Sequence, residues 1–243
     1  MQLMRVFGFF LLAVFLSSLF GFLGVRSEML QREGLVVLYS AGVFLSALVF
    51  RGKFQIFSAG SRFWVVFSFF LPVFYLLLPF LFAGEMPKFY SQPFSTSIAI
   101  VATTFIAAFF EEVGWRGFLF DALSNSSWTT KNLLIGLMWA AWHYPPIFVG
   151  SYLVVGEPVV TILIFTLNVV LLSFIIGWFR EKTGSILAPV LLHASHNLFY
   201  HFSGVYAPIS ESGMLLSLAF MVVLFVLKAW RKPLTSASPV QSC

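Results

Sequence analysis

Charged residues are scarce in this sequence. Asp, Glu, Lys and Arg make up 9% of the 243 residues, while hydrophobic residues make up 60%. This leaves too little polar surface to coat a soluble globule, so a soluble fold is excluded. Cysteine is almost absent as well. The single Cys243 is the last residue and can form neither an internal disulfide nor a prenylation box, which needs a cysteine four residues from the end.

Alternating strand patterns are also missing. Apolar runs of about 18 to 22 residues follow one another, and a helix of that length crosses a hydrocarbon core of roughly 30 Å. The sequence therefore predicts an all-α fold, a polytopic membrane protein with a bundle of about eight transmembrane helices. The predicted spans are 6–25, 34–50, 63–82, 95–120, 132–148, 159–179, 186–200 and 214–229.

Basic residues beside these spans predict the orientation. One side carries ten of them and the other carries three: Arg5, Arg51, Lys53, Arg62, Lys131, Arg180, Lys182, Lys228, Arg231 and Lys232 against Arg26, Arg32 and Lys88. The positive-inside rule then places both termini in the cytoplasm. We expect one transmembrane domain in residues 1–232, with its motif core in 95–203, followed by a disordered Ser-, Thr- and Pro-rich tail in 233–243.

Three charges fall within six residues of the fourth predicted span. A charge near the bilayer centre costs roughly 2.5 to 3.5 kcal/mol, so such residues are expected to pair, face water or take part in chemistry. Glu112 and Arg116 stand four apart, share one helix face and are predicted to pair. Glu111 is rotated away by about 100° and is left for another contact. The alternative is a purely structural ion pair, with Glu111 reaching to the interface.

A histidine ends the fifth predicted span. His143 follows Trp139 by four residues, so both lie on one face, and Pro145 and Pro146 come directly after. Two prolines are predicted to break or kink the helix beside the imidazole. A lone histidine on an apolar helix is more often structural than catalytic, so His143 gains its weight from the other motifs.

The seventh predicted span carries another polar pair. His193 and Asn197 share a face by their spacing of four, and their N–H groups together suit binding of an oxyanion. Simple hydrogen bonding between helices is the alternative. His196, three residues past His193, either flanks the same site or points elsewhere.

The predicted orientation brings these three segments to a similar depth. A carboxylate and an imidazole there can polarise a water molecule, while His193 and Asn197 receive the negative charge that develops on an attacked carbonyl. This combination favours peptide hydrolysis in one step, without a covalent intermediate.

The three motifs together resemble the CAAX prenyl endopeptidase and bacteriocin-processing family, which includes the Rce1-type CAAX proteases. The resemblance rests on Glu-Glu-Val-Gly-Trp-Arg-Gly from Glu111, Trp-x-x-x-His ending at His143 and His-x-x-x-Asn from His193, within residues 110–198. Trp139 departs slightly from the pattern, because Phe is commoner there.

The resemblance implies an intramembrane glutamate-type endopeptidase. Its implied site comprises three pairs: Glu111 and His143 activate water, Glu112 and Arg116 organise Glu111, and His193 and Asn197 bind the oxyanion. We expect a prokaryotic plasma-membrane protein whose partners are membrane lipid and a protein or peptide substrate, with no nucleic acid. Whether the substrate is lipidated stays open. No cofactor or metal is expected.

Three alternatives to that reading are kept. A proton-coupled transporter would use Glu111 and the histidines as a relay, and an immunity scaffold would bind a peptide without cutting it. A zinc peptidase would use a glutamate and two histidines as ligands, although the His-Glu-x-x-His pattern is absent.

Overall fold

The computed structural model describes residues 2–25, 32–50, 62–83, 93–148, 158–203 and 222, and the regular structure of these residues is entirely helical. The helices are α1 Gln2–Val25, α2 Arg32–Val49, α3 Arg62–Ala83, α4 Phe94–Glu112, the π-helix η1 Val113–Leu119, α5 Phe120–Ala122, α6 Trp128–Trp142, α7 Tyr144–Phe148, α8 Pro158–Thr183 and α9 Leu187–Ser203.

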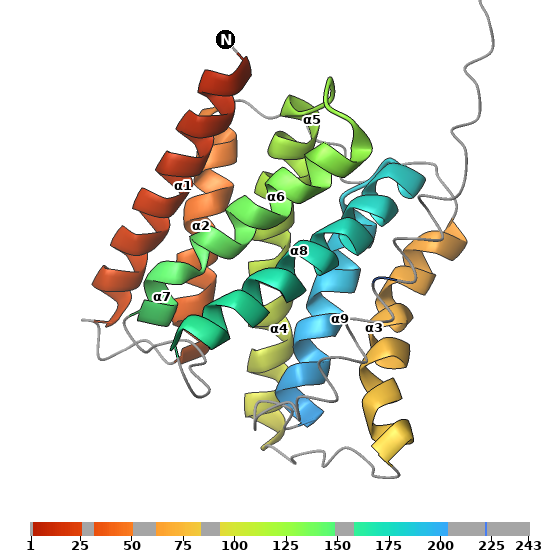
Figure 1. The fold of residues 1–243 in the computed structure, drawn as a ribbon. Coiled ribbons are helices and arrows are strands. Elements are labelled where there is room, and N and C mark those ends of the chain that lie inside the picture. Colours follow the sequence, from red (N-terminus) through yellow and green to blue (C-terminus); the bar gives the residue numbers. More distant parts are fainter. Residues whose placement is uncertain are drawn as a thin grey trace, which may run out of the picture.

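These helices form a bundle with α4 near its centre (Figure 1). Pairwise packing places α1 beside α2, α2 beside α4, α4 beside α9 and α9 beside α3. Helices α6 and α8 pack on each other and cross this row, and α8 also contacts α9. The arrangement brings the end of α4 close to α2, α6 and α9 at once.

The predicted all-α membrane fold is confirmed. The first seven predicted spans correspond to helices, while the eighth, apart from residue 222, and the predicted tail lie outside the described residues. Within the described ranges, three segments are long and apolar enough to cross a membrane: Gln2–Val25, Phe94–Ala122 and Ile162–Thr183. Large apolar side chains such as Leu11 and Phe15 are exposed on α1, as expected for a surface that faces lipid.

Aromatic rings pack closely around the end of α4. Trp115 of η1 is fully buried and contacts the rings of Phe9 and Trp142 edge-on, with centroids 5.6 and 6.1 Å apart. Edge-on contacts between rings contribute about 0.5 to 1.5 kcal/mol each beyond the burial of apolar area. The charged residues of this region thus lie among closely packed, buried aromatic side chains.

The predicted helix break beside His143 is confirmed. Helix α6 ends at Trp142, His143 follows as its C-cap, and α7 begins at Tyr144. Pro145 and Pro146 fall in the first turn of α7, where a missing backbone N–H leaves no hydrogen bond unmade. The imidazole therefore sits at a change of chain direction.

A tight turn connects α8 to α9. Gly184 has a φ of 67°, a left-handed conformation that suits glycine because it has no Cβ. Its amide donates to the carbonyl of Arg180 at 3.0 Å, and the Ser185 hydroxyl accepts from the amide of Leu187 at 3.1 Å. The chain reverses here, and α9 runs back along the bundle with His193 beside the end of α4.

Candidate active site

The acidic segment of α4 leads directly into a π-helix. A π-helix is wider than an α-helix, is rare, and is frequently found at functional sites. Gly114 permits close packing here, because a Cβ at this position would lie 2.3 Å from Cγ1 of Val43 in α2. On the other side, Nε of Arg180 donates to the backbone carbonyl of Arg116 at 2.9 Å. The widened turn was not predicted, since the residue pattern read as a plain helix over 95–120.

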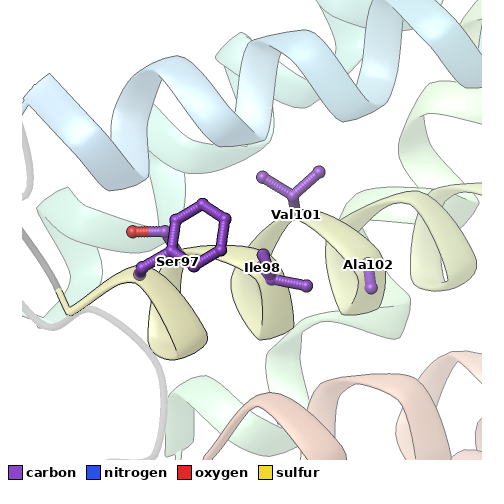
Figure 2. A pocket seen from close by; sticks show the side chains of 5 residues that line it. Ser97, Ile98, Val101 and Ala102 are labelled. Carbon is purple, nitrogen blue, oxygen red and sulfur yellow. The ribbon is translucent and has the colours of Figure 1, made fainter.

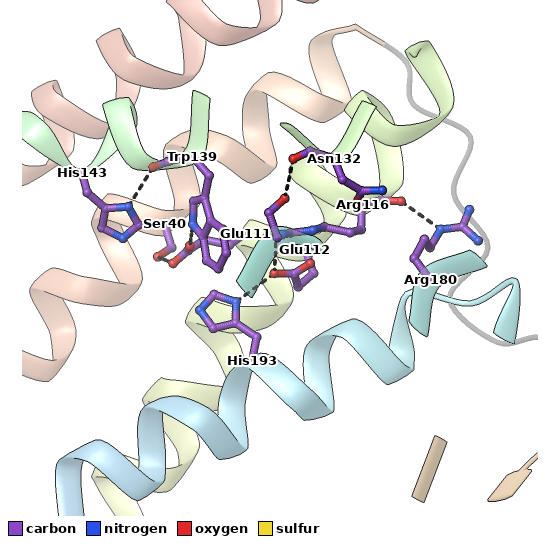
Figure 3. A network of polar contacts seen from close by, with 10 residues as sticks. Ser40, Glu111, Glu112, Arg116, Asn132, Trp139, His143, Arg180 and His193 are labelled. Carbon is purple, nitrogen blue, oxygen red and sulfur yellow. Dashed lines mark hydrogen bonds and ion pairs between the residues drawn. The ribbon is translucent and has the colours of Figure 1, made fainter. Parts of the chain in front are cut away.

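Glu112 is the centre of a buried charged network (Figure 3). Its Oε1 accepts from Nη1 of Arg116 at 3.0 Å and from Nδ1 of His193 at 2.9 Å. The Glu112 and Arg116 side chains have no exposed surface, and that of His193 is 4% exposed. The ion pair predicted from the spacing is present, and His193 joins it from a helix 81 residues away.

The contact with Glu112 fixes the proton on one nitrogen of His193. A carboxylate paired with arginine is ionised and only accepts, so Nδ1 of His193 carries the hydrogen. In the neutral imidazole Nε2 would then be an acceptor. His193 can donate through Nε2 only as the imidazolium.

Glu111 has different partners from Glu112. Its Oε1 accepts from the hydroxyl of Ser40 in α2 at 3.0 Å, and its Oε2 accepts from the indole Nε1 of Trp139 in α6 at 2.8 Å. The predicted divergence of the two glutamates is confirmed. Within the described part of the chain, no hydrogen bond joins Glu111 to Glu112 or Arg116 directly. Ser40 was missed, because a single serine on an apolar helix gives no sequence signal.

His143 is oriented by its own helix. Its Nδ1 lies 2.9 Å from the carbonyl oxygen of Trp139, and a carbonyl only accepts, so Nδ1 carries the hydrogen. Nε2 is then the basic nitrogen of the neutral ring. The rings of Trp142 and Phe165 pack against the imidazole with centroids 4.6 and 5.2 Å away. Glu111 is near enough to act on His143 electrostatically.

Trp139 links the two parts of the site. The Arg116 guanidinium lies over its ring at 4.5 Å from the centroid, and the His193 ring meets it edge-on at 5.0 Å. Its indole N–H contacts Glu111, and its carbonyl contacts His143. Trp139 is part of the second sequence motif, but no role was predicted for it.

The remaining polar residues of α9 lie apart from this network. Asn197, one turn beyond His193, is exposed and has no hydrogen bond within the described residues. His196 turns toward α3, where its Nδ1 contacts the hydroxyl of Tyr75. Of the two options left for His196, the structure selects a direction away from Glu112.

Several buried polar atoms, some of them in the network, have no hydrogen-bond partner among the described residues. They are Oε2 of Glu112, Nε and Nη2 of Arg116, Nε1 of Trp115 and Oδ1 of Asn132. Because unpaired buried polar atoms are costly, they mark capacity for further polar contacts. The open hollow on α4, in contrast, is lined by Phe94, Ser97, Ile98, Val101 and Ala102 (Figure 2). Its mainly apolar lining offers no acid or base.

Metal binding is not evident from the side-chain arrangement. Within the described residues, no group of three His, Cys, Asp or Glu side chains is placed to hold a metal ion. Nδ1 of His193 and Nδ1 of His143 each contact an oxygen, Glu112 Oε1 and the carbonyl of Trp139 respectively. Independence from metal stays a prediction.

The segment that contains the three motifs is similar to known proteins. Residues 93–199 match the family model for "Type II CAAX prenyl endopeptidase Rce1-like". These residues are thus similar to the Rce1-like family. The chain is also similar to "CAAX prenyl protease 2" of Methanococcus maripaludis, at 32% identity over 176 residues.

The match to the Rce1-like model runs from the start of α4 into α9 and contains Glu111, His143 and Asn197. Ser40 in α2 lies outside it. The similarity to the Methanococcus protein covers 64% of this chain and 65% of that relative, a little less than two thirds of the relative's length.

Proposed function

We propose that this Rce1-like chain is an intramembrane endopeptidase that hydrolyses a peptide bond with water activated at Glu111 and His143. One observation carries the proposal. Four helices bring two glutamates, an arginine and two histidines into one hydrogen-bonded and stacked cluster around Trp139, inside an apolar bundle. A cluster of charges is costly in such a place, and catalysis is a reason to keep it.

Glu111 and His143 are the proposed water-activating pair. Each carboxylate oxygen of Glu111 accepts one hydrogen bond, Oε1 from Ser40 and Oε2 from Trp139. Each oxygen therefore keeps a lone pair that can accept a hydrogen bond from water. Nε2 of His143 is basic, because Nδ1 carries the ring hydrogen. Water held between the two groups loses a proton to this pair as its oxygen attacks the carbonyl carbon.

His193 and Asn197 are the proposed oxyanion donors. As an imidazolium held by Glu112, His193 offers its Nε2 hydrogen to the oxygen that becomes negative. Asn197 follows one turn later on the same face, and its exposed carboxamide is open to substrate. The tetrahedral intermediate then collapses: the C–N bond breaks, and the proton taken from water goes to the leaving amine.

The charges of this arrangement balance. Glu111 and Glu112 are each negative, while Arg116 and the proposed His193 imidazolium are each positive, so the cluster is neutral before substrate binds. Neutrality lowers the cost of placing four ionised groups in an apolar bundle. Glu112 and Arg116 touch neither water nor substrate in this scheme and act as positioning residues.

The substrate that we propose is the C-terminal region of a lipidated protein of the CAAX type. The printed name of the Methanococcus relative supports this substrate class. We also propose that the catalytic end of the bundle faces the cytoplasm of a prokaryotic cell. In support, α1, α3 and α6 begin, and α8 ends, toward the side of the bundle at which α4 terminates (Figure 1). These helix ends contain the basic residues Arg5, Arg62, Lys131, Arg180 and Lys182.

Peptide cleavage by the purified protein tests the proposal. Detergent-solubilised protein is incubated with a labelled farnesylated CAAX peptide and with its unprenylated twin, and mass spectrometry identifies the bond that is cut. Cleavage of the farnesylated peptide alone supports both the reaction and the substrate class. Cleavage of both supports only the reaction, and folded protein that cuts neither contradicts the proposed function.

A further inference from the structure

The indole of Trp139 has a geometry that suggests a role in the reaction. We propose that Trp139, assisted by Ser40, is a positioning residue that holds the Glu111 carboxylate oriented toward water. This inference rests on the proposed function, because it concerns the base of that reaction.

Two neutral donors hold both oxygens of Glu111. Trp139 Nε1 donates at 2.8 Å from α6, and Ser40 Oγ donates at 3.0 Å from α2. Because the donors come from different helices that flank α4, the carboxylate cannot rotate without losing at least one hydrogen bond. Such fixed donors set the direction of the remaining lone pairs, which is the requirement for a general base.

Neutral donors matter here because Glu111 is buried, with 5% of its surface exposed, and within the described residues it forms no ion pair. Arg116 is paired with Glu112 instead. Among the described residues, the hydrogen bonds from Trp139 and Ser40 are therefore the contacts that hold the Glu111 carboxylate in place.

The stacking around the indole strengthens its N–H as a donor. The Arg116 guanidinium lies over the ring face at 4.5 Å, and a cation there draws electron density from the ring. The N–H in the ring plane becomes a better donor to Glu111. Arg116 therefore influences Glu111 through Trp139, which gives a physical form to the role that the family resemblance implied for arginine.

Helix α6 also provides a matched control. Trp142 is buried to the same extent as Trp139, with 2% of its surface exposed, and its indole Nε1 also donates a hydrogen bond at 2.8 Å, to Ser17. Trp139→Phe and Trp142→Phe each keep an aromatic ring and remove one buried N–H donor. Only the first removes a donor to Glu111.

A spectroscopic test is independent of turnover. The seven tryptophans are labelled with ¹⁵N at the indole, and the Trp139 and Trp142 signals are assigned by their loss in the two Phe variants. We expect Glu111→Gln to move the Trp139 indole signal and to leave that of Trp142 in place. A Trp139 signal that does not respond to Glu111→Gln would overturn the inference, even if the protein is an active peptidase.

A kinetic test follows on the active protein. Losing one hydrogen bond to a charged group should lower kcat in Trp139→Phe by about 10- to 100-fold. KM should change less than twofold, and Trp142→Phe should lower kcat less than Trp139→Phe does. If Trp139→Phe does not fold, Ser40→Ala removes the other donor and should also lower kcat. A folded donor variant with wild-type kcat contradicts the proposal.

The two tests separate this inference from the proposed function. If wild-type protein cuts no peptide but the Trp139 signal still responds to Glu111→Gln, the proposed reaction fails and the indole contact to Glu111 is retained. If wild-type protein cuts peptide and the signal does not respond, only the role of Trp139 fails.

Discussion

Replacing Glu112 with glutamine perturbs the buried network at its centre. The substitution keeps the size of the side chain and removes its charge. Oε1 of Glu112 accepts from Arg116 at 3.0 Å and from His193 at 2.9 Å, and neither partner is exposed by more than 4%. Arg116 then becomes a buried cation without a counter-ion in hydrogen-bond contact.

The size of the effect follows from that burial. Removing one partner of a buried ion pair costs about 3 to 5 kcal/mol, because the other charge is left uncompensated. At about 2 to 4 °C per kcal/mol for a chain of this size, the apparent Tm of Glu112→Gln should fall by about 6 to 20 °C. His193 also loses the carboxylate that its Nδ1 contacts, so kcat/KM should fall as well.

Thermal unfolding in detergent and steady-state measurement of kcat/KM record the two effects. Glu112→Gln combined with Arg116→Met removes both charges, so it should recover part of the lost stability but not the lost kcat/KM. A Glu112→Gln protein with wild-type melting and wild-type kcat/KM would refute the reasoning about the network.

Three further predictions concern the histidines, the arginine and metal. His143→Ala should lower the turnover rate by a factor of about 10² to 10⁴, as loss of a general base does. His196→Ala and His201→Ala should have milder effects, and steady-state kinetics of the folded variants compares the three. Arg116→Leu should lower the apparent Tm by leaving Glu112 unpaired, and Arg116→Lys should rescue only in part because lysine lacks the planar fork. Extensively dialysed protein should contain substoichiometric zinc by elemental analysis and still turn over. If removal of a stoichiometric amount of metal abolishes activity and added zinc restores it, the result would favour the zinc peptidase.

Local spacing was enough to predict part of the site. The i,i+4 rule placed Glu112 with Arg116, and two consecutive prolines predicted the break after His143, because both features depend on neighbours within one or two helical turns. The all-α membrane fold was predicted from the length of the apolar runs, which is also a property of contiguous sequence.

Contacts between distant helices could not be predicted from the sequence. Ser40 reaches Glu111 across 71 residues and His193 reaches Glu112 across 81, and both contacts depend on how the helices pack. The π-helix after Glu112 also depends on tertiary packing, with Gly114 against α2 and Arg180 donating to the carbonyl of Arg116. The catalytic roles of the six predicted residues depend on such contacts between distant helices, and they stay proposals.

The most direct measurement of the central claim compares peptide cleavage by wild-type protein, Glu111→Gln and Glu181→Gln. Glu181 is an exposed carboxylate near the end of α8, so its variant controls for the substitution itself. All three proteins are first matched by thermal melting. If Glu111 is the base, Glu111→Gln loses about 10² to 10⁴ in rate, while Glu181→Gln cuts the peptide like the wild type. Wild-type cleavage by a folded Glu111→Gln protein would contradict the account.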